Sequence, residues 1–332
     1  MKTILVTGGA GFIGSNLCSR LLQQGDAVIA VDNFITSTGE NLKPLLKNPN
    51  FTFIKHDITK PFPKILNTKY LPAGRHGKIL DTIYHLACPT GVPNVTKLAE
   101  EMLLTCSEGT RNVLELALRN NANLLLTSSS EVYGDPEVFP QSEDYTGNVD
   151  PTGIRSPYEE GKRFSESLVA AYVRKHGLDA KIVRIFNTYG PGMTLGDTRV
   201  IPHFLSQIKK NEPLTVQGDG LQKRTFCYVG DLIDGFLKVL ELGNPGEVYN
   251  LGSDEEITIA DLAKLMLQLS GSKNKIVSVD RPSHDHQARL PSLEKVKKLG
   301  WEQKITLIDG LKKILEWYGV NPNADVIMSY NH

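Results

Sequence analysis

The feature that most constrains the fold is a glycine-rich stretch near the N-terminus. Residues 7–14 read Thr-Gly-Gly-Ala-Gly-Phe-Ile-Gly and separate a predicted strand, Thr3–Thr7, from a predicted helix, Phe12–Gln24. Because glycine lacks a Cβ atom, the backbone there can turn tightly and approach a bound phosphate. The helix N-terminus supplies N–H donors and a favourable dipole for that phosphate. The stretch therefore predicts a strand–turn–helix unit that holds a dinucleotide pyrophosphate, rather than a ligand-free turn.

Short β-branched runs alternate with segments of helical periodicity through the first half of the chain. Strands separated by helices form βαβ units, which build a parallel sheet covered by helices on both faces. We therefore expect an α/β fold of the doubly wound, or Rossmann, class. The further predicted elements are strands Ala27–Asp32, Phe51–His56, Ile83–Leu86, Leu124–Ser128 and Lys181–Phe186, and helices Glu101–Arg119 and Tyr158–Lys175.

The alternation weakens after Asn187, where turn clusters rich in glycine and proline interrupt it. Predicted helices then cover Pro202–Lys210 and Asp231–Leu242, and Glu247–Leu251 is expected to return to the main sheet as a strand. The rest, to about residue 319, is expected to be rich in helix. We predict a cofactor-binding domain of residues 1–190 plus about 229–252, and a smaller C-terminal substrate-binding lobe of about 191–228 plus 253–320.

Composition excludes several classes of partner. The 37 Lys and Arg residues balance 37 Asp and Glu residues, which gives no electrostatic footprint for nucleic acid or an anionic membrane. A membrane span needs about 20 consecutive apolar residues, and the sequence has no such run. The four cysteines lack metal or redox spacing, and His284 and His286 lack a third ligand, so we predict no metal. Without a secretory leader pattern, we expect a cytoplasmic protein.

An acidic residue at the end of the second predicted strand points to the kind of dinucleotide. Asp32 is placed to accept hydrogen bonds from the adenosine ribose and to repel a 2′-phosphate, which favours NAD over NADP. Asp57, after the third strand, lies where adenine is expected. The predicted cofactor-binding residues are Gly8, Gly11, Phe12, Ile13, Gly14, Asp32, Asn33, Asp57, Ile58, Leu86, Tyr158 and Lys162.

Tyr158 and Lys162 stand four residues apart and therefore share one helix face. A neighbouring ammonium lowers the pKa of a phenol from about 10, which would let Tyr158 take a hydroxyl proton while hydride leaves the same carbon. Such a pair also occurs on solvated helices. Ser129 favours the catalytic interpretation, because it closes a strand at the predicted carboxyl edge of the sheet, where side chains converge on ligands.

Four further blocks carry a family resemblance: Ser130–Pro136 (Ser-Glu-Val-Tyr-Gly-Asp-Pro), Tyr158–Arg163, Arg184–Pro191 and Phe226–Leu232. With the glycine turn, they resemble the extended short-chain dehydrogenase/reductase superfamily, and are most similar to UDP-glucuronate decarboxylases (UDP-xylose synthases). The resemblance spans Lys2 to about Leu315. It implies NAD as a recycled cofactor, a UDP-linked sugar as substrate, a 4-keto intermediate that loses CO₂, and a homodimer.

The resemblance also implies roles for individual residues. Ser129 and Tyr158 would donate to the sugar oxygen, while Glu131 and Arg289 would orient the ring and handle the proton delivered to C5. Arg155 would grip the carboxylate, and Arg199 and Arg224 would pair with the diphosphate. The catalytic set is Ser129, Ser130, Glu131, Tyr158, Lys162 and Arg289, and the substrate-binding set is Arg155, Asn187, Arg199, Arg224 and Arg289.

Several positions depart from the decarboxylase pattern. Val95 stands where a tyrosine is expected, Glu101 where a lysine is expected and Cys106 where an asparagine is usual, and residues 64–78 include an insertion. A nucleotide-sugar 4,6-dehydratase, a UDP-glucuronate 4-epimerase and a catalytically silent NAD(H)-binding protein therefore stay open as alternatives. Cys88 and Cys106 are expected to be small buried residues with no basic group placed to activate them.

Overall fold

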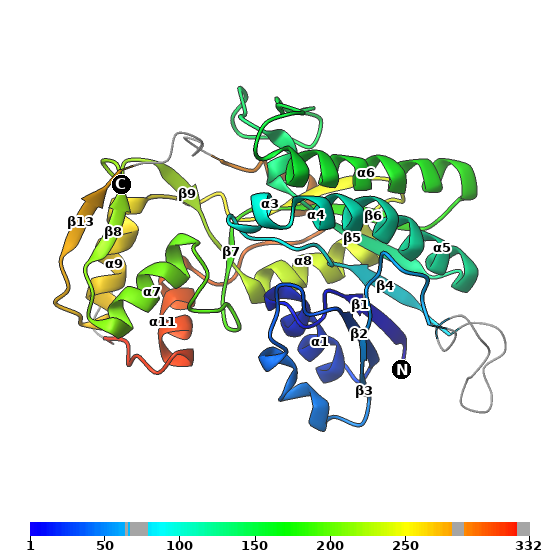
Figure 1. Cartoon of the computed structure of the whole chain (residues 1–332), viewed down its shortest axis with the longest axis horizontal. Helices are drawn as coiled ribbons and strands as arrows, with labels where there is room; N and C mark the ends of the chain where they lie inside the picture. The colour runs from blue at the N-terminus through cyan, green and yellow to red at the C-terminus, as the bar shows by residue number, and fades with distance from the viewer. Residues whose placement is uncertain (64–65, 67–78, 281–288, 324–332) are drawn as a thin grey trace.

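The computed structural model describes residues 1–63, 66, 79–280 and 289–323, and its centre is a seven-stranded sheet in which every pairing is parallel. This confirms the doubly wound α/β class (Figure 1). In their order across the sheet, the strands are β11 (Val248–Leu251), β6 (Ala180–Ile185), β5 (Asn123–Ser129), β4 (Thr82–His85), β1 (Thr3–Thr7), β2 (Ala27–Asp32) and β3 (Phe51–Lys55).

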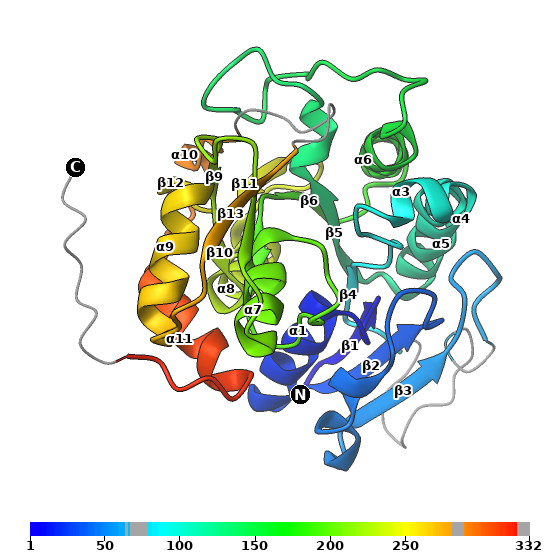
Figure 2. The same ribbon diagram turned by 60° about the vertical axis from the view of Figure 1, so that its left-hand side comes forward.

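Helices cover both faces of the sheet because its strands are apolar on both sides. In β1, Ile4 and Val6 join the cluster beneath α1 (Phe12–Gln23) and α8 (Val229–Leu242), whereas Leu5 joins the cluster beneath α5 (Thr110–Asn120) and α6 (Ser156–His176). Figure 2 shows the two helical layers with the sheet between them. The alternation of side chains along a strand thus sends neighbouring residues into two different cores.

The predicted helix over 101–119 is interrupted. The chain forms α4 (Ala99–Leu104), then one π-helical turn over Thr105–Gly109, labelled η3, and then α5. The hydroxyls of Thr105 and Ser107 donate to the carbonyl oxygens of Glu101 and Leu103 at 2.6 and 2.7 Å, and so compete with the regular ladder. The segment is helical as predicted, but side-chain periodicity alone does not report this competition, so the π-helical turn was not expected.

The C-terminal part of the chain surrounds its own apolar cluster, at the left of Figure 1. Its main helices are α7 (Val200–Lys210), α9 (Ile259–Ser270) and α11 (Leu307–Trp317). Strands within 253–319 were not expected, but β13 (Ile276–Val279) pairs with β8 (Leu214–Gln217), and β12 (Glu256–Thr258) pairs with β9 (Lys223–Thr225). The remaining short elements are η1 (Glu40–Leu42), η2 (Leu45–Lys47), α3 (Asn94–Lys97), η4 (Ser130–Tyr133), β7 (Thr188–Tyr189), β10 (Cys227–Tyr228) and α10 (Glu294–Lys297).

The predicted return of the chain to the main sheet is confirmed, because β11 pairs with β6 in parallel. The C-terminal segment is then tied to α8 through Asp231. Its carboxylate accepts the backbone N–H groups of Lys304 and Ile305, and its carbonyl oxygen accepts Nε1 of the buried Trp301 at 2.9 Å. Two sequence blocks that lie far apart in the chain therefore meet. The proposed domain boundaries themselves stay a prediction.

Strand order reverses between β1 and β4, from which the chain proceeds outward in opposite directions. At such a point the connections leave the sheet on opposite sides and open a crevice at the carboxyl ends of the strands, where doubly wound proteins bind their ligands. The residues that follow β1, β2, β4 and β5 are therefore the ones to inspect. Among the residues that the structure describes, no helix has the length and apolar character needed to cross a bilayer.

Candidate active site

The turn after β1 leaves no room for side chains at two of its glycines. A Cβ atom on Gly14 would lie 2.1 Å from the carbonyl oxygen of Gly8. Gly8 itself has φ +71°, and a Cβ there would lie 2.9 Å from the backbone nitrogen of Ala87. Gly11 is the N-cap of α1 and provides no side-chain cap, which leaves the first N–H groups of the helix available to an anion. These features fit a dinucleotide pyrophosphate.

Asp32 lies beside this turn. One carboxylate oxygen accepts the N–H of Ala10 at 3.1 Å, and the other accepts the N–H of Phe34 at 2.8 Å and the hydroxyl of Ser37 at 3.3 Å. These bonds fix the carboxylate between the glycine turn and the loop after β2. An acidic group held there suits a diol such as a ribose and repels a phosphate in its place.

The other predicted cofactor residues surround the same edge of the sheet. Partial burial would raise the pKa of the Asp57 carboxyl, but hydrogen bonds outweigh it and lower that pKa. One of these hydrogen bonds comes from Asn33. Ile58 points away from this edge, since its side chain packs against Gly109 of η3. Phe12 and Ile13 are partly buried in the first turn of α1, and Leu86 follows β4 next to the glycine turn.

The α6 helix presents Tyr158 and Lys162 toward the end of β5. The buried ammonium of Lys162 donates to the carbonyl oxygen of Thr127 at 2.8 Å, and the Tyr158 hydroxyl is hydrogen-bonded with Ser129. The structure thus brings together the three residues that the sequence predicted as a catalytic unit. A sugar hydroxyl placed between Ser129 and Tyr158 would lie at the carboxyl edge, on the same side as the glycine turn.

The direction of the Tyr158 pKa differs from the sequence prediction. Burial raises the pKa of the phenol to about 12, although Lys162 and the hydrogen bond with Ser129 both act to lower it. Burial alone would lower the pKa of Lys162, yet attraction to Cys88, Cys106 and Tyr158 leaves it raised. The prediction included the ammonium but omitted desolvation, which is the larger effect here.

Glu131 joins segments that are far apart in the sequence. Its two carboxylate oxygens form ion pairs with Arg155, at the start of α6, and with Arg289, from the C-terminal part of the chain. Burial would raise the pKa of Glu131, but the two guanidinium groups outweigh it and lower the pKa to about 2. Arg155 also donates to Glu159 at 3.2 Å. The two guanidinium groups favour the charged form of Glu131, which in turn holds Arg155 and Arg289 in place. Its part in handling the proton delivered to C5 stays a prediction.

Arg289 retains a free donor after this pairing. Its Nη1 lies 3.4 Å from the hydroxyl of Ser130 and also contacts Glu131, whereas its Nη2 is buried and has no hydrogen-bond partner in the part of the chain that the structure describes. A buried donor without a partner is costly, and an anionic ligand would satisfy it. Arg155 already donates to the carboxylates of Glu131 and Glu159, so it is less suited than Arg289 to bind a further carboxylate.

The remaining predicted substrate residues have other contacts. Arg199 is the residue just before α7. Its side chain pairs with Asp197 and is 45% exposed. Arg224 lies in β9 and donates to the carbonyl oxygen of Lys223 at 2.8 Å, while Asn187 connects β6 to β7 and accepts the N–H of Cys227 at 2.9 Å. Their assignment to the nucleotide stays a prediction. His284, His286 and most of the 64–78 insertion lie outside the described residues.

Sequence reasoning missed two polar features next to Lys162. His85 is buried between Thr7 and Thr110, at 2.8 and 3.1 Å, and burial lowers its pKa to about 3. The sulfur atoms of Cys88 and Cys106 lie 3.8 Å apart. The Lys162 ammonium acts to lower the pKa of both thiols, so the expectation that no basic group is placed to activate them was wrong. The scattered cysteine spacing gave no signal, because the loop after β4 and η3 meet only through the fold.

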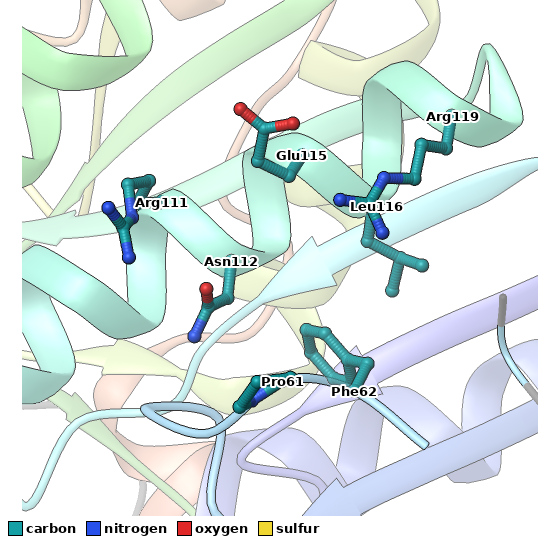
Figure 3. Close-up of a pocket in the computed structure, with 7 residues that line it drawn as sticks. All are labelled: Pro61, Phe62, Arg111, Asn112, Glu115, Leu116 and Arg119. Atoms are coloured by element: carbon teal, nitrogen blue, oxygen red, sulfur yellow. The ribbon is translucent and has the colours of Figure 1, made fainter. Parts of the chain in front are cut away.

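A pocket of about 320 Å³ lies apart from these residues, between α5 and the segment before residue 63. Figure 3 shows Pro61 and Phe62 facing the side of α5 that carries Asn112 and Leu116. It contains none of the predicted site residues. The candidate active site is therefore identified from the strand ends and the buried polar groups, not from cavity size.

Comparison with known proteins agrees with this geometry. Residues 4–252 match the model of the NAD dependent epimerase/dehydratase family. The chain is 42% identical to UDP-glucuronic acid decarboxylase 3 of Arabidopsis thaliana, over 97% of this chain and 90% of that protein. It is also 42% identical to UDP-glucuronic acid decarboxylase 1 of Xenopus tropicalis, over 96% of this chain and 72% of that protein.

Solved structures share the fold over nearly the whole chain. UDP-glucuronic acid 4-epimerase of Bacillus cereus, in complex with UDP-glucuronic acid and NAD, superimposes with a TM-score of 0.83 at 29% identity, covering 95% of this chain and 98% of that one. DesIV, a dTDP-glucose 4,6-dehydratase of Streptomyces venezuelae with NAD bound, gives a TM-score of 0.83 at 28% identity, covering 95% and 96%. The protein therefore belongs to the NAD dependent epimerase/dehydratase family.

Proposed function

We propose that this enzyme decarboxylates UDP-glucuronate to UDP-xylose through a 4-keto intermediate, with its NAD recycled in each turnover. The observation that carries the proposal is the ion pair of Glu131 and the buried Arg289, which leaves Nη2 of Arg289 without a partner among the described residues. A substrate carboxylate is the anion that would satisfy this donor. The identity to UDP-glucuronic acid decarboxylases over almost the whole chain supports the same substrate.

The first chemical step is oxidation at C4 of the sugar. When bound at the glycine turn, NAD⁺ supplies the hydride acceptor and later returns the hydride. Tyr158 takes the C4 hydroxyl proton, and Ser129 holds the same oxygen through its hydroxyl at the end of β5. Lys162 opposes the burial that raises the pKa of Tyr158 and so favours the phenolate, since its ammonium is buried and fixed on Thr127.

The carboxyl group at C5 is then β to a ketone. When the C5–carboxyl bond breaks, CO₂ leaves and its bonding electrons form an enolate whose charge rests on the C4 oxygen. Ser129 and Tyr158 donate hydrogen bonds to that oxygen, which is the electrostatic stabilisation this step needs. Arg289 holds the carboxylate before it leaves, and Glu131 keeps Arg289 in place. C5 then takes a proton from solvent, the hydride returns to C4, and Tyr158 gives its proton back to the C4 oxygen, which completes the pentose.

The alternatives differ in what happens to the 4-keto sugar. A 4-epimerase turns the ring and reduces the other face, and a 4,6-dehydratase removes water from C5 and C6. The structures of both kinds superimpose on this chain equally well, so fold alone does not separate them. The higher identity to the decarboxylases favours decarboxylation. The buried Nη2 of Arg289, which has no partner among the described residues, favours it as well. A silent NAD(H)-binding protein would have no need of the Ser129, Tyr158 and Lys162 set.

The test incubates the purified protein with NAD⁺ and UDP-glucuronate labelled in the carboxyl carbon. We expect labelled CO₂ and UDP-xylose, observed by NMR. UDP-galacturonate without CO₂ would identify an epimerase, and turnover of dTDP- or GDP-hexoses in parallel reactions would identify a dehydratase. If none of these nucleotide sugars reacts, the silent interpretation replaces the proposal.

We further propose a cytoplasmic homodimer. Leu103 and Leu104 of α4 and Phe164 of α6 are exposed apolar side chains on two helices that pack together, and a second copy of this surface would cover them. All four cysteines are free, as is usual in a reducing compartment. Sedimentation of the wild type and of Phe164→Glu tests the dimer; a monomeric wild type would contradict it.

A further inference from the structure

We propose that Cys88 and Cys106 form a reversible intramolecular disulfide, which makes the wall of the cofactor site a target for peroxides. The two sulfur atoms lie 3.8 Å apart in the reduced protein, and they must close to about 2.05 Å to form the bond. The proposal concerns the sulfur chemistry of the protein alone, so it does not depend on which sugar the enzyme uses.

The positions of the two cysteines connect the cofactor site to α6. Cys88 follows Ala87, whose backbone nitrogen is 2.9 Å from where a Cβ of Gly8 would lie. Cys106 is 2% exposed, within η3, and it packs on Gly161 so closely that a Cβ there would be 3.3 Å from its sulfur. This packing restricts movement of the Cys106 sulfur toward α6.

Local chemistry favours reaction at this pair over the other two cysteines. The two thiols share a hydrogen bond. This bond and the Lys162 ammonium outweigh burial and lower the pKa of Cys106 to about 6. The same hydrogen bond and burial raise the pKa of Cys88. The thiolate is the form that reacts with peroxides. By contrast, burial raises the pKa of Cys18 and Cys227, and both are 0% exposed.

The reaction balances with hydrogen peroxide as the two-electron oxidant. A thiolate sulfur attacks the peroxide, so that an S–O bond forms, the O–O bond breaks and the departing hydroxide is protonated to water. The second sulfur then attacks the resulting sulfenic acid; an S–S bond forms, the S–O bond breaks and the thiol proton leaves in a second water. Two thiols and one peroxide thus give one disulfide and two waters.

The bond would alter the cofactor site in two ways. It draws the loop after β4, including Ala87 under the glycine turn, toward η3. It also removes the sulfur charge that now offsets the Lys162 ammonium. Because Gly8 and Ala87 have no free space between them, a displacement of that loop also moves the glycine turn. We expect the oxidised protein to bind NAD⁺ about tenfold more weakly.

The experiment treats the reduced full-length protein with hydrogen peroxide, unfolds it, blocks remaining thiols with N-ethylmaleimide and maps the cysteines by mass spectrometry after trypsin. Cleavage after Lys97 and Arg111 places Cys88 and Cys106 in adjacent, separate peptides. We expect one cross-linked pair that is two hydrogen atoms lighter than the two thiol peptides together. Cys18 and Cys227 should carry the maleimide, and dithiothreitol should restore both thiols and NAD⁺ affinity.

Two variants keep the test decisive. Cys88→Ser should give no cross-link and should accumulate a sulfenic acid at Cys106 that dimedone traps, and its NAD⁺ affinity should not respond to peroxide. Failure to detect the cross-linked peptides in the wild type, or cross-links that join two chains, would overturn the proposal. A cross-link that leaves the NAD⁺ dissociation constant unchanged would overturn the effect on the cofactor site. Cys106→Ala provides the reciprocal variant if Cys88→Ser does not fold.

Discussion

The ammonium of Lys162, on α6, donates a hydrogen bond to the carbonyl oxygen of Thr127, on β5, over 2.8 Å. This bond crosses from the helical layer to the sheet and fixes a buried cation below the tyrosine one helical turn away. Most lysines have freedom to move their charge, but this one is 4% exposed and holds it at one place. The catalytic proposal depends on that fixed charge.

Replacing Tyr158 with Phe removes the group that takes the C4 proton and changes little else in the packing. We expect kcat to fall about 10³-fold, the usual range for a lost general base, while the dissociation constant for NAD⁺ stays within about twofold. Steady-state kinetics and calorimetric titration measure the two quantities. Retention of substantial turnover by Tyr158→Phe would remove the assigned role.

Glu131→Gln breaks a partly buried ion pair on both sides. At pH 7 we expect a loss of about 3 kcal/mol in the free energy of unfolding, measured with urea, because two guanidinium groups lose their charged partner. Glu160→Gln is the matched control; its ion pair with Arg163 spans 3.7 Å at the surface, and we expect a change below about 0.5 kcal/mol.

The same variant carries a pH dependence of definite sign. The pKa of Glu131 is lowered to about 2 in the folded protein, so its contribution is fully present above the unfolded-state pKa of about 4.3 and is lost as the pH falls toward 2. The stability difference between wild type and Glu131→Gln should therefore shrink between pH 4.3 and 3. A difference that is independent of pH in this interval would contradict the ion-pair account.

Arg289→Met tests which ligand satisfies Nη2, for which the described part of the chain offers no partner. We expect the dissociation constant of UDP-glucuronate to rise about tenfold or more, whereas that of UDP-glucose, which lacks the carboxylate, should change much less. Binding is measured by calorimetry with the NADH-loaded protein. Equal weakening for both nucleotide sugars would mean that Arg289 maintains the site but does not recognise the carboxylate.

Asp32→Asn addresses the choice of dinucleotide. Removal of the negative charge should weaken NAD⁺ binding and should bring the dissociation constants of NAD⁺ and NADP⁺ about tenfold closer together, since the repulsion of a 2′-phosphate is lost. Asp26→Asn, just before the opposite end of β2, is the control and should leave both constants unchanged. The prediction fails if the preference for NAD⁺ survives in Asp32→Asn.

Gly14→Ala tests the packing of the glycine turn. The new Cβ would lie 2.1 Å from the carbonyl oxygen of Gly8, so α1 must shift away from the turn. We expect a loss of about 2 kcal/mol in stability and strongly weakened NAD⁺ binding. Gly196→Ala, where no atom lies within 4 Å of the added Cβ, should behave like wild type in thermal unfolding.

Local patterns in the sequence determined the fold class and half of the site. Alternating apolar runs specify strands and helices because the period of side chains is a local property, and β1 and β2 have the bounds that these runs predict. The spacing of Tyr158 and Lys162 places them on one helix face for the same reason. The glycine turn is likewise local, since its geometry depends on a few consecutive residues.

Tertiary structure decided what these residues do together. Glu131 and Arg289 are 158 positions apart, and only the crossing of the C-terminal segment over η4 brings their charges into contact. Cys88 and Cys106 looked inert because the sequence pattern placed no basic group to activate them, yet α6 places Lys162 where it acts on both. The pKa of Tyr158 follows burial, which depends on every segment packed around it. Periodicity encodes faces, but charge pairing and desolvation arise only when those faces are assembled.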